Sequence, residues 1–207
     1  MHYDFEQYFS QILSSMEHAD YIRSDEIPNI DLYMDQVTTF MEKHLAQTRR
    51  YSDDKILTKT MINNYAKNDL LPPPEKKKYN KEHMMFLIFI YYLKNILTIS
   101  DIDKLLSPLR ENYFEHAGGT SSLEEVYETV FSEALSHLPQ IRSDLERYAE
   151  SAADSMKDLD PQNKDYLQLF SLISTLSFDV YLKKQIIERL IDRMPDPQDG
   201  KKKKKKQ

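Results

Sequence analysis

The 207-residue chain has no cysteine and only 3 glycines. The lack of cysteine excludes disulfides, thiolate metal sites and cysteine nucleophiles. Hairpins and barrels use glycine at turns that need positive φ, so the scarcity of glycine disfavours a β fold. No glycine-rich phosphate loop, Gly-x-Ser-x-Gly motif or His-Glu-x-x-His motif occurs in the sequence. We therefore expect no enzyme, no catalytic residue and no cofactor.

Histidines with the spacing of metal ligands are also lacking. His44 and His83 have no cysteine or histidine partner at such a spacing. We interpret both as surface or packed side chains and expect no metal site.

The longest uncharged apolar run in the sequence is too short to cross a membrane. The run at residues 84–93 carries no charge, no glycine and no proline, but it spans ten residues where a bilayer needs about 20. Asp4 and Glu6 stand where an export signal would be basic. We expect a soluble cytoplasmic protein that does not contact a membrane.

The apolar run itself predicts the central helix of the fold. Residues 84–93 read MMFLIFIYYL, so a helix through them is apolar on every side and must be wrapped by other helices. Asn80 is a good N-cap, and we expect the helix to run from Asn80 to about Ile96.

Apolar residues at helical spacing predict further helices before and after this one. Before it, the pattern covers roughly residues 2–19, 31–47 and 59–67, with Asn29 or Asp31 capping the second and Thr58 the third. After it, the capping-box layout of Ser100 and Asp103 predicts a short helix that ends at Pro108.

The C-terminal half predicts a helical bundle. Gly118-Gly119 is the best linker candidate, and Ser122 with Glu125 forms a Ser-x-x-Glu cap behind it. Three apolar stripes then predict antiparallel helices, the last of which is either continuous or broken near residues 177–179. Lysines 201–206 predict a disordered solubilising tail, or alternatively a loose anchor for nucleic acid.

Positive charge is concentrated in the middle of the chain. Residues 1–42 carry net charge -8, residues 43–94 carry +6, residues 100–196 carry -9 and residues 197–207 carry +5, which gives the net charge of -6 for the whole chain. A basic segment between acidic flanks favours one surface that binds a polyanion while the rest repels it. The alternative is chance segregation of solvated charges.

Residues 57–106 combine a short helix, a basic loop and a buried helix. Lys59, Asn63 and Asn64 can face outward from the short helix, and such side chains read base edges in the major groove. Lys76-Lys77-Lys78 on the following loop can bind phosphates. This combination of a base-reading helix and a phosphate-binding loop is typical of a winged helix-turn-helix.

The order of these residues resembles the DNA-binding domain of MerR-type regulators. The resemblance is carried by TKTMINNYAKNDLLPPP (58–74), KKY (77–79) and LTISDIDKLL (97–106). It implies a recognition helix over residues 58–67 and a wing over 72–79. Residues 27–106 also look like an uncharacterised bacterial family, a domain of unknown function with this layout.

Two departures limit what the resemblance implies. Asn63 and Asn64 stand where MerR-type recognition helices have an arginine and a first tyrosine, and Glu75-Lys76-Lys77 replaces Gly-Tyr-Arg in the wing. Base contacts therefore do not transfer, whereas phosphate contacts by Lys77 and Lys78 do.

Together these observations predict an all-α protein that binds DNA. The expected parts are an N-terminal amphipathic helix (1–27), a MerR-like winged helix-turn-helix (28–108), a C-terminal helical domain (120–196) and the lysine tail (197–207). The expected function is a transcriptional regulator that binds double-stranded DNA as a homodimer, with no particular small-molecule effector predicted. The side chains expected at the DNA are Thr58, Lys59, Thr60, Asn63, Asn64, Tyr65, Lys67, Lys76, Lys77 and Lys78.

A second hypothesis belongs to a different class. The missing wing glycine and the acidity of the chain favour a helical protein-protein interaction module that has lost DNA binding.

Overall fold

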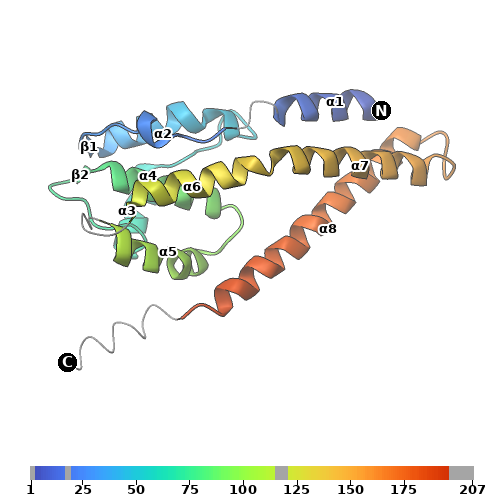
Figure 1. Ribbon diagram of the computed structural model, residues 1–207. Coiled ribbons are helices and arrows are strands. Elements are labelled where there is room, and N and C mark those ends of the chain that lie inside the picture. The colour runs from blue at the N-terminus through green and yellow to red at the C-terminus, as the bar shows by residue number, and fades with distance from the viewer. Residues whose placement is uncertain (1–2, 17–19, 115–120, 196–207) are drawn as a thin grey trace. The chain divides into compact units, whose positions relative to one another are not determined.

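A computed structural model describes residues 3–16, 20–114 and 121–195 (Figure 1). The fold is all-α apart from one small two-stranded sheet, which confirms the predicted class. The described residues form two compact units: 3–16, 20–21 and 130–186 make up the first, and 22–114, 121–129 and 187–195 make up the second. Gly118-Gly119 and the lysine tail lie outside the described residues. No helix of the described chain is long and apolar enough to cross a membrane.

The second unit contains most of the helices and the sheet. Its elements are β1 (Leu32–Tyr33), α2 (Met34–Leu45), α3 (Lys59–Lys67), β2 (Lys78–Tyr79), α4 (Lys81–Leu93), α5 (Ile99–Tyr113) and the first half of α6 (Leu123–Ser136). Short 3-10 turns occupy Ser24–Glu26 and Ala46–Thr48. The strands β1 and β2 are antiparallel, with Leu32 opposite Tyr79 and Tyr33 opposite Lys78.

Helix α4 is the core of this unit, as its composition predicts. All side chains from His83 to Tyr91 are buried, so the helix is covered on every side. The Asn80 side chain caps it by accepting a hydrogen bond from the backbone N–H of His83 at 3.0 Å. The predicted central helix is thereby confirmed, with its end at Leu93 a turn earlier than expected.

The unit extends beyond the predicted range of residues 28–108. Tyr127 of α6 is fully buried, its ring lies 5.4 Å from that of Phe89, and its hydroxyl donates to the carbonyl of Ile22 at 2.5 Å. Lys81 also bonds to Glu124 at 2.9 Å, which ties the start of α4 to α6. Residues on both sides of the predicted range therefore complete the same core.

Two predicted helix starts are corrected. Helix α2 begins at Met34, because residues 32–33 pair with β2 before the helix starts, and neither Asn29 nor Asp31 caps it. Helix α5 is capped by Thr98 rather than Ser100: Thr98 Oγ1 accepts from the backbone N–H of Asp101 at 3.2 Å. The caps at Thr58 and Ser122 are confirmed.

Helix α5 does not stop at Pro108, as the sequence predicts, but continues to Tyr113. Proline removes one backbone donor and usually kinks or ends a helix. Here the residues beyond it make compensating contacts. Arg110 bonds to Ser107 at 2.9 Å and to the carbonyl of Leu70 at 3.2 Å, and the ring of Phe114 packs 5.8 Å from that of Phe86.

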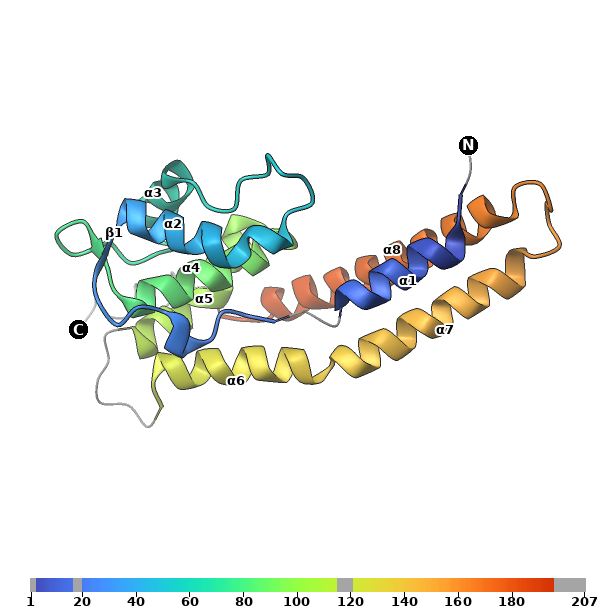
Figure 2. The ribbon, with the colours of Figure 1, turned by 90° about the horizontal axis from the view of Figure 1, so that it is seen from above.

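The first unit is built from α1 (Phe5–Met16), α7 (Leu138–Met156) and most of α8 (Lys164–Asp192) (Figure 2). Its core joins Phe5 of α1 to Leu145, Ala149 and Ala152 of α7 and to Leu172 of α8. The helix predicted as a separate N-terminal part thus belongs to this bundle.

The predicted antiparallel arrangement of the last three helices is wrong in one respect. Helix α7 begins two residues after α6 ends, with Pro139 in its first turn, where a missing backbone donor is harmless. No loop therefore reverses the chain there, and α1 takes the third place in the bundle. Helix α8 is continuous through residues 177–179.

Candidate nucleic-acid interface

Helix α3 presents one polar face to solvent. Thr58 Oγ1 accepts from the backbone N–H of Met61 at 3.2 Å and starts the helix, and Ile62 is fully buried beneath it. The residues on the opposite face are all exposed: Lys59, Thr60, Asn63, Asn64 and Lys67. The amide and ammonium groups of this face are therefore accessible to a ligand.

Two residues predicted at the DNA lie elsewhere. Tyr65 is only 8% exposed, and burial raises the pKa of its hydroxyl. Its ring packs inward because it lies three residues after Ile62 on the same side of the helix. Thr58 is half-buried, and its hydroxyl oxygen is engaged as the cap. Both residues support the helix, and we correct their assignment to the DNA-contacting face.

The predicted wing is a tight turn with two lysines at its tip. The backbone N–H of Lys78 donates to the carbonyl of Glu75 at 2.9 Å, so Lys76 and Lys77 are the two central residues. Their φ values are 49° and 65°, in the left-handed region. Glycine or asparagine is favoured at such positions, and other residues lose about 1–2 kcal/mol each there. Both lysines are exposed.

The start of α2 brings this turn and helix α3 together. Tyr33 pairs with Lys78 in the sheet, and the Lys78 ammonium lies 5.4 Å from the centre of the Tyr33 ring. Two residues later, Asp35 forms an ion pair with Lys59, the first residue of α3. The basic turn and the polar face of α3 therefore meet at residues 33–35.

A buried histidine lies at the base of the turn. His83 is 2% exposed, and its ring packs edge-on against Tyr79 of β2 at 5.5 Å and Phe114 at 4.8 Å. Its Nδ1 accepts from the backbone N–H of Asn80 at 3.2 Å. Burial lowers the pKa of His83 to about 4. The ring therefore joins β2, α4 and the end of α5 as a neutral group.

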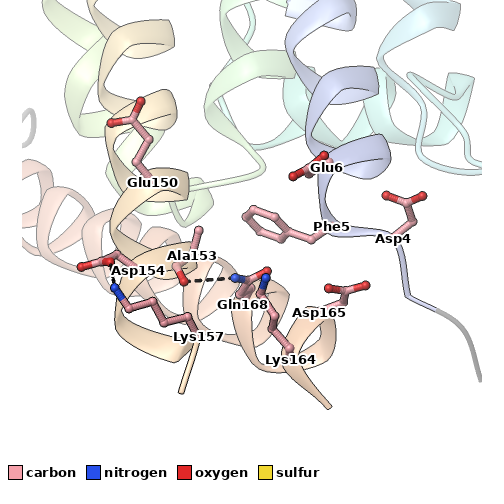
Figure 3. A pocket seen from close by; sticks show the side chains of 10 residues that line it. All are labelled: Asp4, Phe5, Glu6, Glu150, Ala153, Asp154, Lys157, Lys164, Asp165 and Gln168. Atoms are coloured by element: carbon pink, nitrogen blue, oxygen red, sulfur yellow. Dashed lines mark hydrogen bonds and ion pairs between the residues drawn. The ribbon is translucent and has the colours of Figure 1, made fainter. Parts of the chain in front are cut away.

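An open cleft lies in the other unit, between α1, α7 and α8 (Figure 3). It has a volume of about 620 Å³, and its lining includes Asp4, Glu150 and Asp165. The side chain of Gln168 points to it and donates to the carbonyl of Ala153 at 3.0 Å. No three histidine or acidic side chains of the described residues are placed to hold a metal ion.

The positive φ values of the turn could not be expected from its residues. Two-residue hairpin turns of this kind are recognised by Asn-Gly or Asp-Gly, and residues 75–78 read EKKK. The pairing of residues 32–33 with β2 was missed for a related reason, because strands of two residues carry no alternating pattern.

The second unit is a helical domain with a two-stranded sheet, and its helix α3 has an exposed face of lysine and asparagine side chains. Residues 22–130 match the model of a domain of unknown function, DUF1836. The match covers more than half of the chain, and the protein belongs to this family. This confirms the expected membership of a family of unknown function. In the comparisons with curated proteins and with solved structures, nothing matches the chain.

Proposed function

We propose that the protein binds double-stranded DNA through the outer face of α3 and the turn of residues 75–78, and that it regulates transcription. The observation that carries the proposal is the pair of exposed lysines held at positive φ at the tip of the turn. Backbone strain of this kind clusters at functional sites. Two cations at the tip of a short hairpin are suited to phosphate groups.

The order of elements supports a winged helix-turn-helix of MerR type. Helices α2 and α3 are followed by the turn and by the buried α4, and β2 pairs back onto β1 at the start of α2. In such a domain the exposed α3 residues face base edges, and asparagine recognises adenine with two hydrogen bonds. The lysines of the turn contact the backbone beside them.

Loss of a base contact changes the sequence preference of DNA binding, whereas loss of a phosphate contact weakens binding to all sequences. The first experiment measures this difference. Asn64→Ala should relax sequence preference by about 1–3 kcal/mol at one base pair, because a two-pronged contact to a base is lost. Lys77→Glu with Lys78→Glu should weaken binding to all duplexes alike. Selection of bound fragments from a random duplex library, followed by anisotropy titrations, measures both effects. Equal loss on all sequences for Asn64→Ala would contradict base reading by α3.

The ion pair between Asp35 and Lys59 opposes binding in the free protein. Asp35 places a carboxylate at the edge of the proposed interface and holds the ammonium of Lys59. We expect Asp35→Asn to strengthen duplex binding several-fold at low salt, because it frees one cation and removes one repulsive charge. Anisotropy titrations at 50 and 200 mM salt measure this, with Asp154→Asn in α7 as the matched control. Unchanged or weaker binding by Asp35→Asn would contradict the placement of Lys59 at the DNA.

Binding as a homodimer is part of the proposal. One short helix reads few base pairs, and two copies on adjacent half-sites multiply the affinity. The alternative function, a protein-protein interaction module, is favoured by one observation: Lys59 is already neutralised by Asp35. Capture of a protein partner that survives nuclease treatment, without any duplex binding, would support the alternative.

A further inference from the structure

Helix α8 has a second apolar face beside the one that packs into its bundle, and at its N-terminal end the ring of Tyr166 lies 5.4 Å from that of Tyr3. Leu172 is buried against α1 and α7, and Leu169 and Leu176 pack beside it. Around the helix from these residues, Tyr166, Phe170, Ile173 and Val180 are 43%, 56%, 53% and 60% exposed. Residues 166–178 contain no charged side chain. A solvated helix face normally carries charges, so this face is built for contact.

The exposed residues follow the spacing of a helix-helix seam. Tyr166, Phe170, Ile173, Ser177 and Val180 succeed one another at intervals of four, three, four and three residues, and we call them the α8 stripe. This is the heptad spacing of two helices packed side by side. Ser177 suits such a seam, because its hydroxyl donates to the carbonyl of Ile173 at 2.7 Å within the same helix.

We infer that the α8 stripe is the dimer interface, and that its occupant is the α8 stripe of a second copy of this chain. In an isologous interface the same patch of both copies meets, so the patch must be complementary to itself. An uncharged heptad seam meets this condition, because two copies of it bring no like charges together. A partner selected by charge would find no charge on residues 166–178 to select.

The area available fits a pair of copies. Tyr181 adjoins the stripe and is 53% exposed. With about 150–250 Å² for a whole aromatic side chain, half-exposure of the four apolar stripe residues and Tyr181 leaves about 500 Å² on each copy. Two copies would bury about 1,000 Å², which is the lower limit for a specific interface. A partner with a smaller apolar surface would fall below this limit.

The residue that follows the α8 stripe along the seam indicates the direction in which the two helices pair. Continued by one step, the seam reaches Lys184. In a parallel pair the two Lys184 side chains would meet. In an antiparallel pair the aliphatic stem of Lys184 covers the part of the Tyr166 ring that is left exposed beside Tyr3. The antiparallel register places Phe170 opposite Val180 and Ile173 opposite Ser177 of the second copy.

Sedimentation velocity on the full chain without DNA tests the interface. We expect a dimer at micromolar concentration. Phe170→Glu with Ile173→Glu should raise the dimer dissociation constant at least about 100-fold, because four apolar side chains in the dimer are replaced by four negative charges. The matched control is Phe178→Glu with Leu182→Glu. These residues lie on the same helix with 60% and 43% exposure, but outside the stripe, and the control should remain dimeric.

A cross-linking experiment tests direction without relying on the glutamate variants. The chain has no cysteine, so introduced thiols react only with one another. Phe170→Cys and Val180→Cys place thiols about 15 Å apart along the helix. In the antiparallel register each variant alone gives little covalent dimer on oxidation, and an equal mixture of the two gives much.

Three results would overturn the inference: a monomeric full chain at about 100 μM, equal weakening by the stripe variant and its control, or cross-linking by each cysteine variant alone. A glutamate variant whose circular dichroism differs from that of the unaltered chain is replaced in the comparison by Ile173→Gln. Because all measurements are made without DNA, failure here removes the homodimer from the proposed function but leaves duplex binding by α3 and the turn standing. Failure of DNA binding leaves the dimer standing.

Discussion

Replacing Lys76→Asn together with Lys77→Gly should make the protein more stable and a weaker DNA binder. The two residues have φ values of 49° and 65°, which Asn-Gly adopts without the penalty of a lysine. Relief of that penalty at both positions should raise the free energy of unfolding by about 2–4 kcal/mol. Loss of two phosphate contacts should lower the affinity for duplex DNA by about 10–100-fold at 0.1 M salt.

Urea denaturation and anisotropy titrations on the same preparation measure the two changes. A control variant, Lys76→Arg with Lys77→Arg, keeps both charges and both strained residues, and should keep stability and binding near those of the unaltered chain. Lys157→Asn with Lys164→Asn removes two charges from the other unit and should leave both properties unchanged. Higher stability with undiminished binding would mean that the strain at the turn serves no phosphate contact.

The second large effect is a loss of folding stability as the pH falls. His83 has a pKa of about 4 in the folded protein because it is buried, although the backbone of Pro73 and Pro72 and the charge of Asp31 oppose this shift. Its ordinary value is 6.5, so between pH 4 and 6.5 the unfolded chain binds the proton more readily than the folded chain. Stability from His83 is therefore complete above pH 6.5 and lost as the pH falls to 4, by about 3 kcal/mol.

The control for this prediction is His83→Gln. Glutamine at this position keeps the capping arrangement with Asn80 but cannot take up a proton. Denaturation curves between pH 4 and 7 should lose stability more steeply for the unaltered chain than for His83→Gln. Carboxylates contribute equally to both curves, so parallel curves would show that His83 is not held neutral. Duplex affinities of the unaltered chain and of His83→Gln, measured over the same pH range, would report whether the base of the turn opens as His83 takes up a proton.

The parts of the fold that sequence predicts well are those where local chemistry decides. Thr58 and Asn80 have side chains that satisfy free backbone donors, so the starts of α3 and α4 follow from single residues. The apolar run at residues 84–93 predicts a helix that is covered on all sides, because no polar face remains. The exposed positions of α3 follow from the burial of Ile62 in the same way.

The parts that sequence predicts poorly depend on partners distant in the chain. Helix α5 continues past Pro108 because Arg110 reaches the carbonyl of Leu70, which no local pattern encodes. Phe5 and Leu172 share a core although more than 160 residues separate them. Tyr65 belongs to the motif that resembles a recognition helix, yet its ring is a core residue. In the candidate site, the exposed polar residues of α3 were predictable, whereas the inward position of Tyr65 and the strained turn that presents Lys76 and Lys77 were not.

The most direct test of the proposed function is the salt dependence of duplex binding by the full chain in which lysines 201–206 are replaced by glutamine. Five lysines belong to the proposed interface: Lys59, Lys67, Lys76, Lys77 and Lys78. The logarithm of the affinity should fall linearly with the logarithm of the salt concentration with a slope of about −3 to −4.5, and Lys76→Asn with Lys77→Gly should reduce that slope by about 1.8. No binding at micromolar protein in 50 mM salt, or the same slope in that variant, would contradict the account.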